Sequence, residues 1–101
     1  MRGMTREEAI ARLKPHEAEL RAAGLSALYL FGSTPRNDAG QDSDVDLMCE
    51  IGRSSRMDLI AFAGLKRRIE TYVASRTDLV ERGSMRPRVR ARAEADMVRI
   101  F

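Results

Sequence analysis

The sequence contains a wholly apolar run, Ala27 to Phe31, that has the length of a strand and is followed at once by a polar segment. Such a run predicts a buried strand. Residues 32–43 are rich in Gly, Ser, Asn, Asp and Pro, and this composition predicts a loop. Val45 to Ile51 places its apolar residues at the odd positions, which predicts a second strand with one face toward the core. Cys49 belongs to that face and is expected to be a buried small hydrophobe rather than a reactive thiol.

The segment before the first strand has the pattern of an interrupted helix. Thr5 and Glu8 have the spacing of a capping box, which predicts a helix start. Lys14-Pro15 predicts a kink or a restart, because proline has no backbone N–H to donate inside a helix. Gly24 predicts the end of the helical segment, since glycine tolerates the left-handed conformation common after a last turn.

The segment after the second strand predicts a helix, a strand and a helix. Met57 to Ala74 is amphipathic with apolar residues at helical spacing, and Thr77 to Val80 has the length of a short strand. A last helix is expected to open at Gly83-Ser84. Its packing stripe recurs every four residues: Met85, Val89, Ala93, Met97 and Phe101. We therefore expect an α/β (α+β) fold in a single domain, residues 1–101, with a mixed sheet of three or more strands flanked by helices.

Composition places few limits on function but does indicate the cellular compartment. The 101 residues are 44% hydrophobic and 33% charged, as expected for a globular protein, and the net charge of +3 permits contact with phosphate without requiring it. A single cysteine excludes an internal disulfide, and no stretch has the length of a signal peptide core or a membrane span. A cytoplasmic protein without membrane contact is expected.

Asp44 and Asp46 lie two positions apart at the start of a strand, so both carboxylates leave the same face. Carboxylates this close raise each other's pKa unless a cation lies between them, and Mg²⁺ accepts one or two protein carboxylates beside water and phosphate oxygens. Asp78 of the third strand would complete a two-metal site. A calcium-binding EF-hand loop is the rival interpretation, but it fails because Leu47 and Arg53 replace its required Gly and Glu.

Gly32-Ser33 directly follows the first strand, where phosphate-binding turns occur. Glycine lets a backbone approach a phosphate closely, and a short helix near Thr34-Pro35 would direct free N–H groups at the same anion. Ser33 adds a hydroxyl and Arg36 a guanidinium. Each feature alone has an ordinary explanation as a turn or a surface side chain, but together they predict an anion site beside a metal-binding pair.

The Gly-Ser pair, an arginine three residues later, and Ser-Asp-Val-Asp-Leu at 43–47 resemble the signature of the DNA polymerase beta-like nucleotidyltransferases. Over essentially its full length the chain resembles their smallest branch, the minimal nucleotidyltransferases (MNT), usually antitoxins of HEPN/MNT toxin–antitoxin pairs. Pro35 and Asn37 replace the alanine and glycine common in the family. Asn37 tolerates the left-handed conformation, so it is an acceptable substitute.

The resemblance implies a function and a set of roles. Asp44, Asp46 and Asp78 would be catalytic and would hold two Mg²⁺ ions, while Gly32, Ser33, Arg36 and Ser43 would bind the nucleotide. The substrate is expected to be ATP, and AMP would pass to a hydroxyl, a tyrosine, of a cognate HEPN ribonuclease toxin in a hetero-oligomer. The size of the chain agrees with this, because it leaves little room for a domain that binds a small second substrate.

Two other functions remain open from the sequence. The protein would also act as an antitoxin if it neutralised its partner by tight binding alone. Nucleic-acid binding is suggested by six arginines against two acidic residues from position 82 to the end. Direct nucleic-acid binding is not expected, however, because these arginines spread around a helix and no aromatic stacking platform accompanies them.

Overall fold

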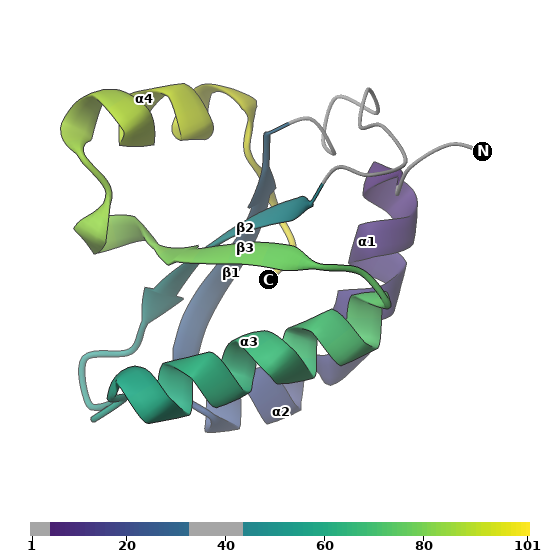
Figure 1. The fold of residues 1–101 in the computed structure, drawn as a ribbon, viewed down its shortest axis with the longest axis vertical. Helices are drawn as coiled ribbons and strands as arrows, with labels where there is room; N and C mark the ends of the chain where they lie inside the picture. The colour runs from purple at the N-terminus through teal and green to yellow at the C-terminus, as the bar shows by residue number, and fades with distance from the viewer. Residues whose placement is uncertain (1–4, 33–43) are drawn as a thin grey trace.

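A computed structural model of the chain describes residues 5–32 and 44–101. Helices α1, α2 and α3 lie on one face of a sheet, and α4 covers the opposite face (Figure 1). The predicted α/β fold, a mixed sheet flanked by helices, is confirmed. None of the helices in the described ranges is long and apolar enough to cross a membrane. In chain order the elements are α1 (Arg6–Leu13), η1 (Lys14–His16, a 3-10 helix), α2 (Glu17–Ala22), β1 (Leu25–Phe31), β2 (Val45–Ile51), α3 (Leu59–Val73), β3 (Thr77–Glu81), η2 (Arg82–Ser84, a 3-10 helix), α4 (Pro87–Asp96) and β4 (Val98–Arg99).

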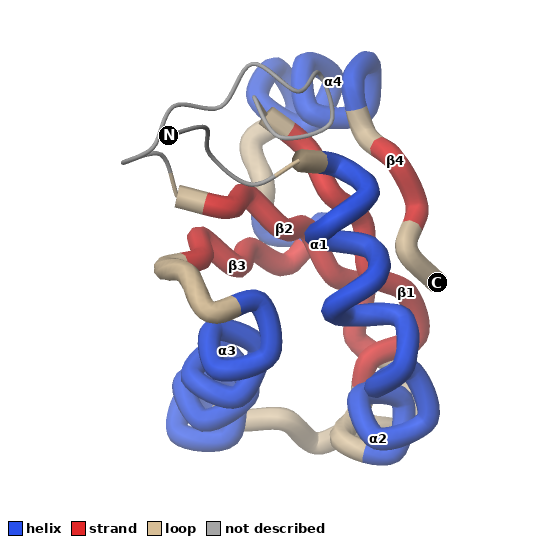
Figure 2. The backbone as a smooth tube through the Cα atoms, turned by 90° about the vertical axis from the view of Figure 1, so that its right-hand side faces the viewer, coloured by secondary structure: helices blue, strands red, loops and turns tan. Residues whose placement is uncertain are grey.

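The sheet has four strands in the order β3-β2-β1-β4. β1 pairs antiparallel with β2 and with β4, whereas β2 and β3 are parallel. A parallel pair needs a long connection, and α3 supplies it by crossing one face of the sheet. Figure 2 shows β3 and β4 at the two edges, with β3 on the side of α3. This topology brings the beginnings of β2 and β3 to the same end of the sheet.

The N-terminal helical segment follows its sequence signals. The Thr5 hydroxyl oxygen accepts a hydrogen bond from the Glu8 backbone N–H at 3.1 Å, which caps α1. The expected interruption at Lys14-Pro15 is the 3-10 helix η1, which carries Pro15 at its start. Gly24 follows α2 with φ of 123°, a conformation that other residues rarely adopt, and the chain turns there into β1.

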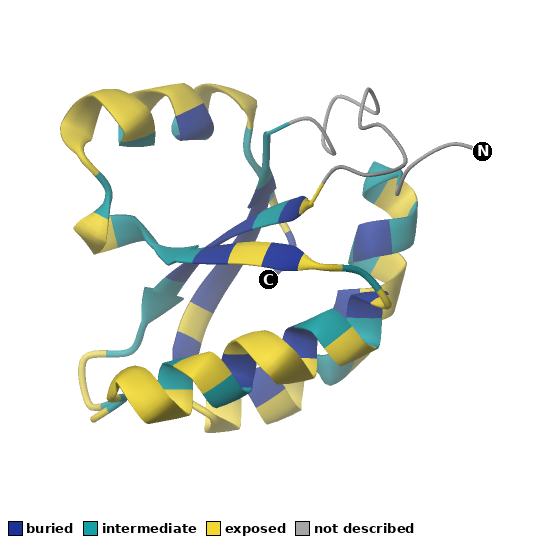
Figure 3. Cartoon of the chain, in the orientation of Figure 1, coloured by how far each residue is buried: buried dark blue, intermediate teal, exposed yellow. Residues whose placement is uncertain are grey.

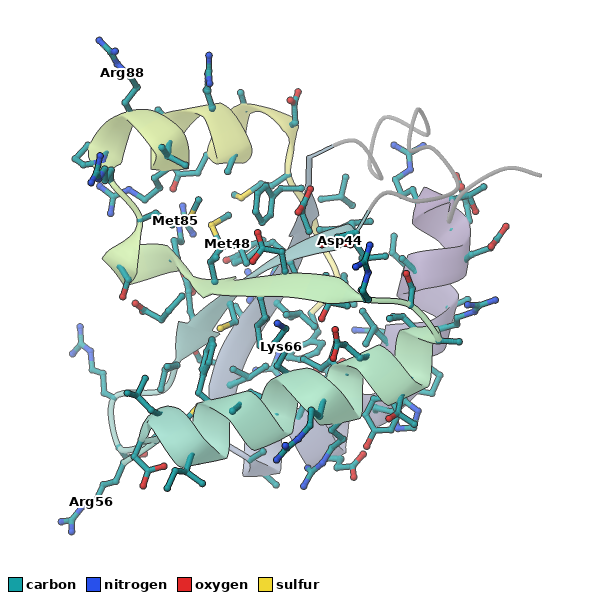
Figure 4. All side chains as sticks on the ribbon, viewed as in Figure 1. Asp44, Met48, Arg56, Lys66, Met85 and Arg88 are labelled. Atoms are coloured by element: carbon teal, nitrogen blue, oxygen red, sulfur yellow. The ribbon has the colours of Figure 1, made fainter. Side chains whose placement is uncertain are left out.

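The two faces of the sheet carry separate apolar clusters. The larger lies between the sheet and α1 to α3 and includes Leu30, Leu47 and Cys49, all fully buried. The smaller lies under α4 and includes Tyr29 and Met48 (Figure 4). Burial of one such side chain contributes about 1.5–3 kcal/mol to the free energy of unfolding. The alternation in β2 therefore predicts the main core correctly, although the opposite face is also buried where α4 covers it.

Two predicted boundaries change. β1 begins at Leu25 rather than Ala27, because Leu25 pairs with Ile51 beyond an irregularity in the ladder. The expected last helix forms, but it begins at Pro87 rather than at Gly83-Ser84 and does not extend to Phe101. α4 ends at Asp96, and the chain then extends into β4, where the Ile100 N–H donates to the Leu28 carbonyl at 2.8 Å. The free edge of β1 offers backbone hydrogen bonds to this segment. These bonds favour an extended conformation over the helix that the spacing of the apolar residues predicts.

Candidate active site

Asp46 and Asp78 are neighbours across the parallel pair of β2 and β3. The ladder places them directly opposite each other, so their side chains leave the same face of adjacent strands. That face is the one covered further along by α4, because Met48 lies two residues after Asp46 and packs under that helix. Two acidic residues that are 32 positions apart in the sequence therefore meet at one end of the sheet.

Gly32 lies against the carboxylate of Asp46. In the antiparallel ladder Phe31 pairs with Asp46, and Gly32 comes immediately after Phe31 at the end of β1. A Cβ at position 32 would lie 2.3 Å from Asp46 Oδ2, closer than any real contact, and φ at Gly32 is 79°. Both the space and the backbone conformation require glycine here. The turn after β1 thus contacts the acidic pair directly.

The electrostatic environment of Asp46 disfavours its charged form. Partial burial raises the pKa of its carboxyl group most, and the carboxylates of Asp78 and Asp44 raise it further. Two neighbouring carboxylates therefore oppose the ionisation of Asp46 at this end of the sheet. A cation placed among them would reverse the effect on the pKa of Asp46.

Asp44 immediately precedes β2, and its side chain is directed to an arginine. Asp44 Oδ1 lies 3.3 Å from Arg76 Nε, and both side chains are substantially exposed (Figure 4 labels Asp44). Arg76 immediately precedes β3, and its carbonyl accepts from the Val45 N–H at 3.0 Å. No motif in the sequence marks Arg76. Arg76 lies beside Asp44 because each residue comes immediately before one of two paired parallel strands. The sequence alone does not give the register of that pair, so it could not predict this contact.

The donor set suits Mg²⁺. Among residues 5–32 and 44–101, no three His, Cys, Asp or Glu side chains are gathered as a complete metal site. Magnesium does not need such a cage, because it binds through one or two carboxylates and completes its octahedron with water and phosphate oxygens. The facing pair Asp46 and Asp78 meets this requirement. Asp44 would add a third carboxylate once its side chain turned from Arg76.

A hollow of about 490 Å³ opens beside Gly32, between the end of β1 and the second half of α4. Phe31 and Ala93 give it an apolar side, and Arg92 and Asp96 add one charged side chain of each sign. The hollow therefore offers room for a planar or sugar-like group next to the acidic pair. Three predicted nucleotide-binding residues, Ser33, Arg36 and Ser43, lie outside the described residues.

A mixed sheet with facing acidic residues at the start of two parallel strands, beside a glycine turn, is suited to a small domain that binds a nucleotide together with a metal ion. Comparison with known families agrees, since residues 13–100 match the nucleotidyltransferase domain family. The chain belongs to the nucleotidyltransferase domain family. The expectation that it is a nucleotidyltransferase is confirmed.

Comparison with individual proteins shows that the chain is similar to the minimal nucleotidyltransferases within this family. The chain is 33% identical over 84 residues to the protein adenylyltransferase MntA of Thermococcus cleftensis, covering 82% of this chain and 83% of the relative. A solved structure of a minimal nucleotidyltransferase superposes with a TM-score of 0.79 and 27% identity, over 94% of this chain and 95% of the other. The resemblance to the minimal nucleotidyltransferases is thus confirmed.

A more distant likeness concerns the fold alone. A chain in the complex of a tri-AMPylated HEPN toxin with an MNT antitoxin from Shewanella oneidensis superposes with a TM-score of 0.65. The identity is 20%, and the match covers 91% of this chain and 71% of that one. The same arrangement of sheet and helices therefore occurs in a toxin–antitoxin assembly.

Proposed function

We propose that this chain is a Mg²⁺-dependent protein adenylyltransferase that acts as an antitoxin. It transfers AMP from ATP to a tyrosine hydroxyl of a HEPN-family toxin encoded as its partner. The observation that carries the proposal is the facing pair Asp46 and Asp78 in contact with the Gly32 turn. The similarity to an adenylyltransferase at 33% identity supports the choice of AMP and of a protein acceptor.

Each residue has a role that its position supports. Asp44, Asp46 and Asp78 would hold the cations that accompany the triphosphate, and Asp78, which faces Asp46 across the ladder, would also accept the proton of the acceptor hydroxyl. Mg²⁺ bound to these carboxylates supplies positive charge that screens the phosphates and lowers the pKa of the acceptor hydroxyl. Gly32 keeps the turn close enough to hold the outer phosphates, and the hollow beside it takes the nucleoside.

The reaction is an in-line displacement at the α-phosphorus. The acceptor oxygen forms a bond to that phosphorus, and the bond from the α-phosphorus to the oxygen that bridges the α- and β-phosphates breaks. Pyrophosphate leaves with the bonding electrons, and the hydroxyl proton passes to the Asp78 carboxylate and then to solvent. No oxidant or reductant takes part, and the product is a tyrosine bearing AMP through a phosphodiester.

The test is the intact mass of the partner toxin after incubation with this chain and Mg-ATP. We expect an increase by whole AMP units and loss of the toxin's ribonuclease activity. The double variant Asp44→Asn/Asp46→Asn should give no mass change, whereas Glu7→Gln, an exposed acid on α1, should behave as the wild type. If the double variant still protects ribonuclease substrates through a stable complex, the antitoxin acts by occlusion and transfer is not its mechanism.

A further inference from the structure

The turn between α3 and β3 holds the backbone of Arg76 in a fixed place. Ala74 ends α3 with φ of 56°, a left-handed conformation that is uncommon for a residue other than glycine. The Ser75 N–H donates to the Glu70 carbonyl at 3.3 Å, and the Thr77 N–H donates to Glu70 Oε2 at 3.0 Å. The residues on both sides of Arg76 are therefore anchored to the same glutamate of α3.

The same turn brings Arg76 beside Asp44. The Val45 N–H donates to the Arg76 carbonyl at 3.0 Å, and Val45 is the register partner of Thr77 in the parallel ladder. Arg76 and Asp44 each come one residue before this paired position, and Arg76 Nε lies 3.3 Å from Asp44 Oδ1. Figure 3 shows the chain exposed just before β2 and just before β3, in contrast to the buried middle of the sheet. The ion pair is therefore open to solvent and to ions, although the backbone on which it stands is fixed.

Asp44 belongs to the acidic group at this end of the sheet, and Arg76 engages one oxygen of its carboxylate. Partial burial raises the pKa of Asp46, and Asp78 and Asp44 raise it further, so both neighbours act on that carboxylate. A divalent cation held by Asp46 and Asp78 would attract the Asp44 carboxylate as well. The guanidinium of Arg76 and a bound metal ion therefore compete for Asp44.

We propose that Arg76 is a positioning residue that withholds Asp44 from the metal site until a divalent cation displaces it. Binding of Mg²⁺ by all three carboxylates then requires the ion pair to separate, and the pair lowers the metal affinity of the chain. Exposed ion pairs contribute modestly, so the effect is a few-fold change in affinity rather than orders of magnitude. The inference rests on the proposed function, since it takes the facing pair Asp46 and Asp78 as the metal site, and it adds a control on the loading of that site.

The test is the affinity of the purified chain for Mn²⁺, measured from the loss of the free-ion signal in electron paramagnetic resonance. Mn²⁺ takes the same octahedral oxygen ligands as Mg²⁺ and is observed directly. Arg76→Gln should bind Mn²⁺ about threefold more tightly than the wild type. Arg56→Gln is the matched control, because it removes the same charge from an exposed arginine at the other end of the molecule from Asp44 (Figure 4). Its affinity should equal that of the wild type.

A double-mutant cycle separates the ion pair from the general effect of charge. In the Asp44→Asn background, Arg76→Gln should change the affinity for Mn²⁺ far less, because the contact that it removes is already absent. An equal gain in both backgrounds would overturn the inference, since it would show that Arg76 acts only through its net charge. The gain from Arg76→Gln should also shrink at high ionic strength, as expected for an exposed pair. Circular dichroism and thermal unfolding establish that the variants remain folded.

Different outcomes separate this inference from the proposed function. Wild-type affinity for Mn²⁺ in Arg76→Gln would overturn the role of Arg76 and leave the proposed AMP transfer, which intact mass measures, standing. The expected cycle in a chain that transfers no AMP to the toxin would overturn the proposed function and leave this inference standing. Mn²⁺ binding that is absent from the wild type, or that persists in Asp44→Asn/Asp46→Asn, would overturn the metal site on which both depend.

Discussion

Gly32 packs so closely against Asp46 that a Cβ at position 32 would lie 2.3 Å from Asp46 Oδ2. The turn that follows β1 and the acidic pair on β2 and β3 thus cannot be altered independently. A side chain at position 32 displaces the carboxylate, and a displaced carboxylate no longer faces Asp78.

Gly32→Ala should abolish transfer, by at least a hundredfold, while destabilising the fold by about 1–2 kcal/mol. The stability cost arises from φ of 79°, which alanine adopts with strain, and from the shift forced on Asp46. Intact mass measures the transfer and urea unfolding the stability. Gly64→Ala is the matched control, since no atom lies within 4 Å of a Cβ there and α3 should gain up to about 1 kcal/mol. Equal effects in the two variants would refute the steric explanation.

Asp46→Asn should raise the midpoint of thermal unfolding at pH 7 by a few degrees in the presence of EDTA. Burial, and then Asp78 and Asp44, raise the pKa of Asp46 in the folded state above its unfolded value. The ionised group therefore lowers the free energy of unfolding at neutral pH, and this penalty fades as pH falls through the folded pKa. The advantage of the variant should shrink toward pH 4.

The same pair of proteins tests cation binding. Mg²⁺ should raise the unfolding midpoint of the wild type and narrow its difference from Asp46→Asn, because a cation that binds only the folded state stabilises it. Differential scanning calorimetry with and without Mg²⁺ measures both effects. A variant less stable than the wild type at every pH in EDTA would show that Asp46 stabilises the fold through contacts other than charge.

Cys49 should resist thiol reagents in the folded protein. Its side chain is fully buried, and burial, followed by the nearby Glu81, raises the pKa of the thiol to about 12. The thiolate is the reactive form, so labelling of the folded chain should stay slow and vary little between pH 7 and 9. In urea, labelling should be fast and should rise with pH as an ordinary thiol ionises. Rapid labelling of folded protein at pH 7 would contradict the burial of Cys49 in the core.

Arg82→Ala should destabilise the chain by about 1–2 kcal/mol. Arg82 Nε donates to Glu94 Oε2 and Nη1 to Glu50 Oε1, each at 2.8 Å, and the guanidinium lies 5.4 Å from the centroid of the Tyr29 ring. These contacts tie α4 to the sheet face that carries the acidic pair. Arg82→Lys should recover less than half of the loss, since an ammonium lacks the planar fork of donors.

Arg88 provides the control for that prediction. It lies on α4 and points away from the sheet (Figure 4), so Arg88→Ala should change the free energy of unfolding by less than about 0.5 kcal/mol. Urea unfolding of the three variants measures the differences. If Arg82→Ala matched Arg88→Ala, the contacts of Arg82 with Glu50 and Glu94 would not hold α4 in place.

The sequence predicts well those features that depend on local pattern. The capping box at Thr5, the interruption at Pro15 and the odd-numbered core face of β2 all follow from neighbours in the chain, and all are confirmed. The pairing of Asp46 with Asp78 could not be predicted from local pattern, because the register of a parallel ladder depends on how α3 packs. The sequence identified both carboxylates, but only the fold shows that they face each other.

The errors have a single physical cause. The spacing of Met85, Val89, Ala93, Met97 and Phe101 fits one helix. Yet Phe101 belongs to the main core on the far side of the sheet, and Val89 is half exposed. Backbone hydrogen bonds to the open edge of β1 decide the conformation after Asp96, and no local pattern encodes them. The contacts of Gly32 with Asp46 and of Arg76 with Asp44 were missed for the same reason, since each joins separate elements.

The parallel connection through α3 also separates the two members of the acidic pair along the chain. Asp46 and Asp78 lie on either side of the fifteen-residue helix α3 and face each other only when β2 and β3 are paired. A nascent or partly folded chain therefore exposes acidic side chains without an assembled pair. A nucleotide that binds only the assembled pair would therefore stabilise the folded chain and not its unfolded form.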